Sequence, residues 1–287
     1  MTPSPKAHLL AGRTVVSVGG PDARSFLQGL ITNDIHKATL SRAIYAALLT
    51  PQGKYLHDFF IIEFDGALLL DCAADGVDDL IRRLTMYKLR SDVSIDDRTG
   101  DLQVYAVLGG WADGPGASPG DAKAVGDGIA FTDPRMAALG ARLILPAGTA
   151  PDMATGEFED YERLRLSLGV PDGPRDIEVE RTLILEADLD ELNGVDFHKG
   201  CYVGQELTAR MKHRGKVRKK LIPVEVSGPL PEPGAAITVD GKAIGAIRSG
   251  LDGQAMALIR LEDLDGVEWA ECGEARVKPR IPDWLDR

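Results

Sequence analysis

Short apolar runs separated by glycine and proline dominate this chain and limit the folds that it can adopt. The strongest runs, at 59–62 and 68–70, have the length of strands. None approaches the roughly 18 apolar residues that a membrane-spanning helix needs. Apolar residues at helical spacing occur only in single segments between these runs. The pattern predicts an α+β chain rich in strands, with no membrane partner.

The first hundred residues predict strands that alternate with single helices. A β-branched run at 14–18 is followed by two glycines, a proline and then apolar residues at helical spacing. Two strands are predicted at 43–49 and 55–64. The turn TPQGK joins them, and its proline and glycine positions are those of a tight hairpin turn. A third strand at 67–72 and a helix at 77–88 follow.

The composition changes after Lys220, where the chain becomes a series of short strands punctuated by glycine and proline. These strands are predicted at 221–226, 236–239, 243–247 and 255–259. Their spacing is typical of a small β-barrel, so we divide the chain into residues 1–220 and a C-terminal barrel at 221–287. Residues 109–128 are dense in glycine, proline, alanine and aspartate, and we expect a loop there.

The charge balance excludes some classes of partner, and the cysteine content indicates the cellular compartment. The chain has 33 Lys and Arg against 44 Asp and Glu, a formal net charge of −11. This balance argues against DNA and anionic membranes as partners. The chain begins without the pattern of a secretory signal. Its three cysteines, Cys72, Cys201 and Cys272, are far apart and odd in number, which indicates a reducing compartment. We therefore predict a cytoplasmic location.

The most unusual segment is FHKGCYVGQE at 197–206. Cys201 lies between two glycines, Lys199 lies two residues before it, and a helix is predicted to begin near Gln205. If Cys201 lies at the N-terminus of that helix, the helix dipole and Lys199 would both favour its thiolate. The alternative is that Cys201 is a small buried residue and that the glycines only serve a turn. Both interpretations stay open at this point.

Two further features have a functional and a plain interpretation. The stretch from Arg210 to Lys220 contains seven Lys or Arg and no acid. It is either a solvated face or a site for an anion, an acidic partner or a short stretch of RNA, of which RNA fits least because aromatic residues are scarce. Asp58, in an aromatic strand, either has a catalytic or binding role, in which it hydrogen-bonds a buried ring nitrogen or acts as a base, or it faces solvent.

The sequence lacks the common motifs for metal, nucleotide and serine-hydrolase sites. The cysteines have no C-x-x-C spacing, and one chain with three thiols cannot supply the four thiolates of an iron–sulfur cluster alone. A cluster shared with a partner is not excluded. Neither a P-loop, nor a dinucleotide-binding glycine motif, nor G-x-S-x-G occurs.

Several motifs in order along the chain resemble one family. KGCYVGQE at 199–206, with the basic residues that follow it, resembles the signature of the YgfZ family. Members of this family are folate-binding relatives of the glycine-cleavage T-protein, an aminomethyltransferase, and are associated with iron–sulfur cluster assembly or repair. QGLITND at 28–34, LTPQGK at 49–54 and LRLSLGVP at 164–171 resemble further family motifs. Together these motifs cover most of residues 10–220.

The resemblance implies a fold and a use for particular residues. It implies a T-protein-like ring of subdomains around a central folate cavity, with two interleaved α+β subdomains in residues 1–220 and a small C-terminal β-barrel. It implies that the family's activity depends on Cys201. Asp58 aligns with the T-protein aspartate that contacts the reactive nitrogen region of folate. Ser167 stands in place of the glutamate that holds the pterin, which argues against aminomethyl transfer.

The function implied is that of a folate-binding accessory protein for the assembly or repair of [4Fe-4S] clusters, rather than an enzyme. Cys201 would act as a thiolate, aided by Lys199, and as a ligand of a cluster shared with a partner. Tetrahydrofolate would contact Asn33, Asp58, Tyr202, Gln205 and Glu206. The basic residues Arg210, Lys212 and Arg214 would contact the glutamyl tail of the folate or an acidic partner. The partners would be A-type iron–sulfur carriers and cluster-containing enzymes.

The alternative is a tetrahydrofolate-dependent aminomethyl or one-carbon transferase. Such an enzyme would need Asp58 more than Cys201. Any effect on tRNA modification would be indirect, through thiolation enzymes that contain clusters.

Overall fold

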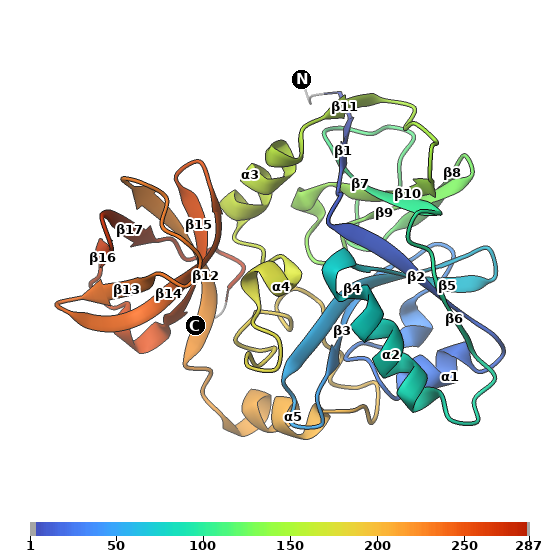
Figure 1. Ribbon diagram of the computed structural model, residues 1–287, viewed down its shortest axis with the longest axis horizontal. Helices are drawn as coiled ribbons and strands as arrows, with labels where there is room; N and C mark the ends of the chain where they lie inside the picture. The colour runs from blue at the N-terminus through green and yellow to red at the C-terminus, as the bar shows by residue number, and fades with distance from the viewer. Residues whose placement is uncertain (1–3, 286–287) are drawn as a thin grey trace.

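Two sheets and a barrel form the fold, which the computed structural model describes over residues 4–285 (Figure 1). The first sheet has the strand order β3-β4-β5-β2-β6. Its strands are β2 (Arg13–Gly19), β3 (Ile44–Leu49), β4 (Tyr55–Phe64), β5 (Ala67–Ala73) and β6 (Ser94–Asp97). The hairpin predicted from TPQGK is β3 and β4, which pair in antiparallel fashion.

The second sheet has the order β11-β1-β7-β10-β9-β8. Its strands are β1 (Lys6–Leu9), β7 (Leu102–Leu108), β8 (Ala122–Val125), β9 (Gly128–Thr132), β10 (Ala141–Pro146) and β11 (Ala154–Gly156). Strand β1 precedes the first sheet in the chain but belongs to the second, so the two sheets are interleaved in sequence.

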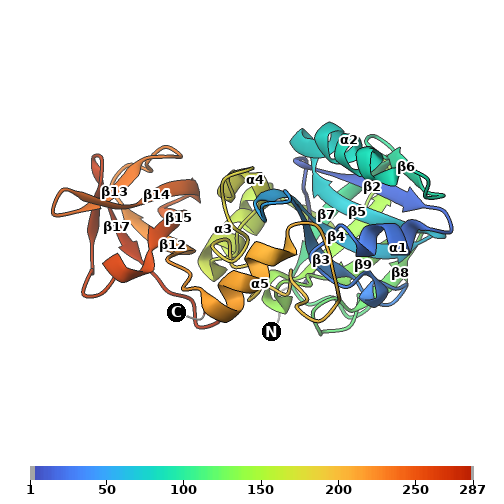
Figure 2. The ribbon, with the colours of Figure 1, turned by 90° about the horizontal axis from the view of Figure 1, so that it is seen from below.

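Helices cover the sheets and connect them to the barrel. The α-helices are α1 (Ala23–Gln28), α2 (Val77–Lys88), α3 (Phe158–Leu168), α4 (Gly173–Asp176) and α5 (Gln205–Arg214). Single-turn 3₁₀ helices lie at 35–37, 74–76, 137–139 and 261–263. Helices α1 and α2 pack on the first sheet, whereas α3 lies between the second sheet and the barrel (Figure 2). No helix in the described residues is long and apolar enough to cross a membrane.

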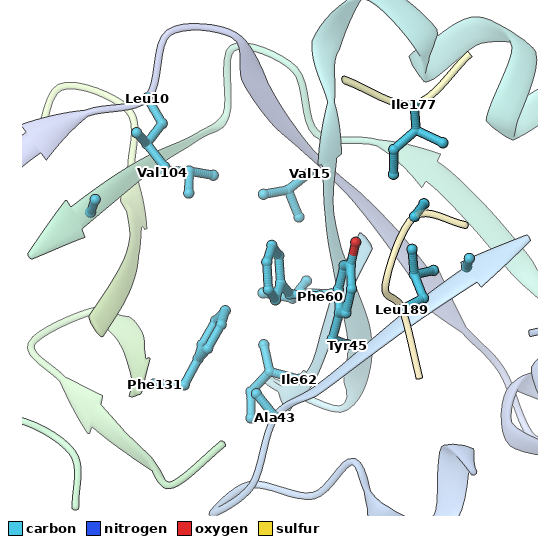
Figure 3. Packing of buried hydrophobic residues seen from close by; sticks show 14 of the residues in the cluster. Leu10, Val15, Ala43, Tyr45, Phe60, Ile62, Val104, Phe131, Ile177 and Leu189 are labelled. Atoms are coloured by element: carbon cyan, nitrogen blue, oxygen red, sulfur yellow. The ribbon is translucent and has the colours of Figure 1, made fainter. Parts of the chain in front are cut away.

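Strand β4 explains why a continuous apolar run occurs in the sequence. Phe60 and Ile62 point to a core between the two sheets, while Phe59 and Ile61 point to the core under α1 and α2. Both faces of the strand are therefore buried, and the usual alternation of polar and apolar residues is absent. The Phe60 ring lies 6.1 Å from that of Phe131 on the second sheet (Figure 3).

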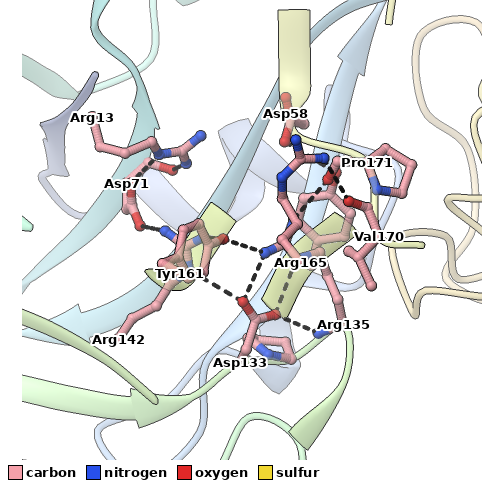
Figure 4. Close-up of polar contacts among 12 residues, drawn as sticks. Arg13, Asp58, Asp71, Asp133, Arg135, Arg142, Tyr161, Arg165, Val170 and Pro171 are labelled. Carbon is pink, nitrogen blue, oxygen red and sulfur yellow. Dashed lines mark hydrogen bonds and ion pairs between the residues drawn. The ribbon is translucent and has the colours of Figure 1, made fainter. Parts of the chain in front are cut away.

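Buried ion pairs connect the sheets beside this aromatic core. Arg142 of β10 donates to Asp71 of β5 at 2.7 Å, and Arg13 of β2 donates to the other carboxylate oxygen at 2.7 Å (Figure 4). The Arg142 guanidinium also lies 3.8 Å from the centre of the Phe60 ring. Asp133 accepts from Arg142 on the second sheet. Because each buried charge has a partner, the network is tolerated in the interior.

The C-terminal region is a closed barrel with the order β12-β15-β14-β13-β16-β17. Its strands are β12 (Lys219–Ser227), β13 (Ala236–Val239), β14 (Lys242–Leu251), β15 (Gln254–Arg260), β16 (Ala270–Cys272) and β17 (Ala275–Pro279). Closure leaves no free sheet edge. The predicted α+β class with a terminal barrel is confirmed.

The predicted loop at 109–128 needs a correction, because it contains β8. After the Gly- and Pro-rich part, the residues Ala122–Val125 pair with β9 at the edge of the second sheet. An edge strand makes ladder hydrogen bonds on one side only and needs little apolar burial, so the polar composition did not prevent it.

Arg165 of α3 fastens the barrel to the rest of the chain. It is fully buried and donates to Glu162 at 2.5 Å, to Asp176 of α4 at 2.7 Å and to Ser249 of β14 at 2.8 Å. One guanidinium therefore joins α3 and α4 to a barrel strand whose Ser249 lies 84 residues later in the chain.

We predict that Arg165→Leu lowers the free energy of unfolding by about 3–5 kcal/mol, because Glu162 and Asp176 would be left as buried charges without their main partner. Urea denaturation would measure this loss. The control is Arg163→Leu on the same helix, whose half-exposed ion pairs are worth about 0–1 kcal/mol. Equal losses in the two variants would contradict the role of Arg165.

Candidate functional site around the Cys201 loop and the central cavity

Three of the sequence motifs meet at one place in the fold. We call residues 199–204 the Cys201 loop. The Val203 amide donates to the carbonyl of Gly29 at 3.1 Å, at the end of α1. The Gln28 side chain donates to the carbonyl of Lys199 at 3.1 Å. These contacts bring the QGLITND and KGCYVGQE segments together although about 170 residues separate them.

The hairpin turn between β3 and β4 forms the other wall of the Cys201 loop. Gly204 has φ +86°, and a Cβ there would lie 2.5 Å from the Thr50 carbonyl oxygen. A Cβ on Gly53 of the turn would lie 3.0 Å from the Gly204 carbonyl oxygen. Only glycine fits at Gly204, because both the positive φ and the space exclude a side chain. The two glycines let the turn and the start of α5 approach each other closely.

Cys201 is exposed and carries a free thiol, whereas Cys72 and Cys272 are buried. Gly200, with φ +96°, precedes it in open space. Burial raises the pKa of the Cys72 thiol to about 12 and also raises that of Cys272. The interpretation of Cys201 as a buried packing residue is therefore wrong. It is the accessible thiol of the three.

Lys199 does not serve as the activator of the thiol that we expected. Its Nζ donates to the carbonyl oxygens of Gln28 at 2.5 Å and Ile31 at 2.6 Å. Burial lowers its pKa to about 8. These carbonyls follow the last turn of α1 and lack helical partners, so the amine satisfies them and fastens the Cys201 loop to α1. Among the described residues, no hydrogen bond joins Lys199 to Cys201.

The helix start also lies farther from the thiol than we expected. Helix α5 begins at Gln205 and its N-cap is Gly204, so Cys201 precedes the first turn by several residues. Gln205, an expected folate contact, accepts a hydrogen bond from the Tyr202 amide at 3.0 Å. The effect of a helix dipole falls off within the first turn. The structure therefore gives no support to activation of Cys201 by the helix.

A separate cavity of about 530 Å³, which we call the central cavity, lies between α3, α4 and the first residues of β2. Phe158 and Tyr161 contribute aromatic surface, and Arg13, Arg142 and Arg175 contribute positive charge. The apolar and polar remainder of the wall is formed by Leu9, Leu10, Ala11, Gly12, Ala73, Asp75, Asp172 and Pro174. Although burial opposes ionisation, neighbouring arginines hold the pKa of Asp172 below its usual range. Each of these arginines pairs with a carboxylate of this chain, and of the three Arg175 is the half-exposed one, so the cavity suits a molecule with a flat ring and an anionic group near Arg175.

Asp58 is buried behind this cavity, not on its wall. Its carboxylate accepts from the hydroxyls of Tyr45 at 3.0 Å and Tyr55 at 2.5 Å. Gly173 lies against it, since a Cβ there would be 2.8 Å from Asp58 Oδ1. Burial and the Asp58 charge raise the pKa of both tyrosines well above the usual value. The interpretation of Asp58 as a solvent-facing residue is wrong.

The remaining expected folate contacts do not surround the cavity. Asn33 is buried and donates to the carbonyls of Tyr45 and Asn193, both at 2.8 Å. Tyr202 is half-buried beside Lys199, whose Nζ lies 4.9 Å from its ring centre. Glu206 and Arg210 form an exposed ion pair on α5 at 2.7 Å. The side chain of Arg214 lies outside the described residues.

The basic stretch is partly neutralised within the fold. Lys212 pairs with Asp190 at 2.8 Å, and the buried Lys220 pairs with Glu191 at 2.7 Å. The stretch is therefore not simply a solvated face. Ser167, which argued against aminomethyl transfer, donates to the carbonyl of Leu164 on the exposed side of α3, away from the cavity wall.

Sequence reasoning missed the arginines of the cavity. Arg142 lies in the apolar strand ARLILP, and a charge inside such a strand was the available signal. Within residues 4–285, no group of three or more His, Cys, Asp or Glu is arranged to hold a metal ion.

Comparison with known proteins gives consistent results over the whole chain. Residues 13–114 match the family model of the GCVT N-terminal domain, and residues 218–287 match that of the CAF17 C-terminal β-barrel domain. The chain is 37% identical to the mouse iron–sulfur cluster assembly factor IBA57, mitochondrial, with 96% of this chain and 84% of that protein aligned. The human protein of the same name is 35% identical at the same coverage. The chain belongs to the IBA57 family.

The fold also has a solved counterpart. The glycine cleavage system aminomethyltransferase T from Bartonella henselae superposes with a TM-score of 0.78, covering 98% of this chain and 86% of that one. At 16% sequence identity this similarity shows the fold alone. The T-protein-like architecture implied by the motifs is thereby confirmed.

The predicted cytoplasmic location is wrong, because the IBA57 relatives from mouse, human and Neurospora crassa are mitochondrial proteins. A low number of unpaired cysteines indicates a reducing compartment rather than an oxidising one. It does not distinguish one non-oxidising compartment from another.

We predict that Lys199→Met loosens the Cys201 loop, because two hydrogen bonds to the end of α1 are lost. Hydrogen–deuterium exchange of the Val203 amide should become about tenfold faster or more. Lys37→Met is the control, since that amine is exposed and, within residues 4–285, pairs with Asp196 alone at 2.6 Å. Unchanged protection of Val203 in Lys199→Met would show that the amine does not hold the loop.

Proposed function

We propose that this IBA57-family chain assists the assembly or repair of [4Fe-4S] clusters on target enzymes, with Cys201 Sγ as its point of contact. The observation that carries the proposal is the exposure of one thiol while the other two are buried. Cluster iron is bound by thiolates, and a thiolate must be accessible to reach iron held by another protein.

The shortage of ligands defines how the cluster is handled. A [4Fe-4S] cluster takes four thiolates, and this chain offers one accessible thiol. The cluster is then cargo that bridges Cys201 and a partner, which supplies the other ligands. A-type iron–sulfur carriers and the cluster-containing target enzymes are the partners of this chemistry. The loop between Gly200 and Gly204 presents Cys201 in an exposed position.

We predict that Cys201→Ser fails to restore the activity of a [4Fe-4S] enzyme such as aconitase in cells that lack this gene. The serine variant should keep the stability of the wild type, because Cys201 is exposed. Cys272→Ala is the matched control and should restore activity, since that buried thiol only packs in the barrel. Full rescue by a well-folded Cys201→Ser would overturn the proposal.

We also propose that the central cavity binds tetrahydrofolate. The volume of about 530 Å³ lies within the usual range for sites of drug-sized ligands. Phe158 and Tyr161 can pack against a pterin or benzoyl ring, and Arg175, half-exposed at the cavity, can bind a glutamate carboxylate. Asp172 can accept from pterin N–H groups. A bound reduced folate would supply a carrier of one-carbon units.

Asp58 supports this cavity from behind. It holds the hydroxyls of Tyr45 and Tyr55, and Gly173 beside it leads into Asp172 and Pro174 on the wall. In this arrangement Asp58 orients the wall rather than binding folate directly. The tetrahydrofolate-dependent transferase remains the second candidate, because the same cavity would serve it and the architecture is that of aminomethyltransferase T.

We predict that tetrahydrofolate binds the wild-type protein and that Phe158→Ala weakens binding about tenfold, through lost ring contact. Quenching of protein fluorescence, with equilibrium dialysis as a second method, would measure it. Phe197→Ala is the control, because that ring contacts His213 near α5 and not the cavity. Equal affinity in the two variants would place the folate elsewhere.

A further inference from the structure

The C-terminal end of α2 exposes a cluster of large apolar side chains. Met86 is 64% exposed, Tyr87 is 39% exposed and Leu89 is 88% exposed. We call these three residues the α2 patch. Helix α2 covers the face of the first sheet that is turned away from the second sheet (Figure 2). Single exposed apolar residues are common, but three within four positions mark a surface that excludes water on binding.

The backbone at Leu89 is strained as well as exposed. The Ser91 amide closes a turn onto the Lys88 carbonyl at 2.8 Å, and Leu89 is its first central residue, with φ 45° and ψ −104°. These angles are close to those of a type II′ turn, where glycine predominates because a Cβ is disfavoured. A leucine there costs conformational free energy and leaves its side chain in water. Neither cost is offset by packing within this chain, because the side chain is 88% exposed, so an external contact would give this leucine a use.

The charges around the patch indicate what it contacts. The segment LIRRLTMYKLR, residues 80–90, contains four Lys or Arg and no acid. Arg82 and Arg83 both bind Asp79. Lys88 and Arg90, on either side of Leu89, form no ion pair among the described residues. Two free cations therefore flank the most exposed leucine.

We propose that the α2 patch docks an amphipathic helix of a partner protein, with apolar side chains on Leu89 and Met86 and carboxylates opposite Lys88 and Arg90. A protein partner fits better than an anionic membrane, because binding to anionic lipid takes a cluster of several unpaired Lys or Arg, whereas Arg82 and Arg83 are already paired with Asp79. This surface is additional to Cys201 and does not depend on the proposed iron–sulfur function.

Leu89→Gly tests the proposal, because relief of the turn should preserve or raise the stability of the fold, whereas loss of the side chain should weaken binding of the partner. Glycine relieves the turn, so the melting temperature should stay the same or rise by about 1–3 °C. Binding of a helical peptide with leucines on one face and glutamates along its borders should weaken about tenfold. Leu40→Ala, at another exposed leucine, is the control for both measurements.

A second variant tests the charges. Arg90→Glu should also weaken binding of the glutamate peptide about tenfold, and added salt should weaken binding to the wild type.

Four results would overturn the proposal. They are no binding of the peptide by the wild type, equal binding of a peptide with lysines in place of glutamates, binding only to phosphatidylglycerol vesicles, and dimerisation of the chain that Leu89→Gly abolishes. A clear fall in melting temperature in Leu89→Gly would also overturn it, because Leu89 would then pack internally.

Discussion

Buried arginine–carboxylate pairs join separate parts of this chain, beside the apolar core that the two sheets share. Asp71 on one sheet binds Arg13 and Arg142, which come from the two different sheets. Arg165 joins α3 and α4 to the barrel in the same way. Each pair is costly to desolvate, and each is tolerated because every charge faces a partner (Figure 4). The central cavity is the space that remains between the elements fixed by these pairs.

The Cys201 loop is held by different means. Backbone hydrogen bonds, two glycines and the Lys199 amine attach it to α1 and to the hairpin turn. This arrangement fixes the backbone on both sides of Cys201 and leaves the thiol uncovered. The chain thus combines a rigid, charged cavity with an exposed thiol on a separate surface. An accessory protein that contacts cargo on a partner needs the exposed thiol, and a ligand-binding protein needs the cavity.

The parts that could be predicted from the sequence depend on local patterns. The β3–β4 hairpin follows from apolar runs around a Pro-Gly turn, and α5 follows from the polar residues after Gly204. The meeting of KGCYVGQE with QGLITND could not be predicted from spacing, because it depends on contacts across about 170 residues. The direction of the Lys199 side chain was missed for the same reason, and so was Asp58, whose tyrosine partners were not recognised.

We propose that, of the three thiols, Cys201 alone contacts the cluster. The direct measurement is anaerobic circular dichroism and absorption spectroscopy of a mixture of this protein with a cluster-loaded A-type carrier. We expect the wild type and Cys272→Ala to change the visible spectrum of the cluster, whereas Cys201→Ser should leave the spectrum of the carrier as it was. The same spectral change with Cys201→Ser would show that this thiol is not the point of contact.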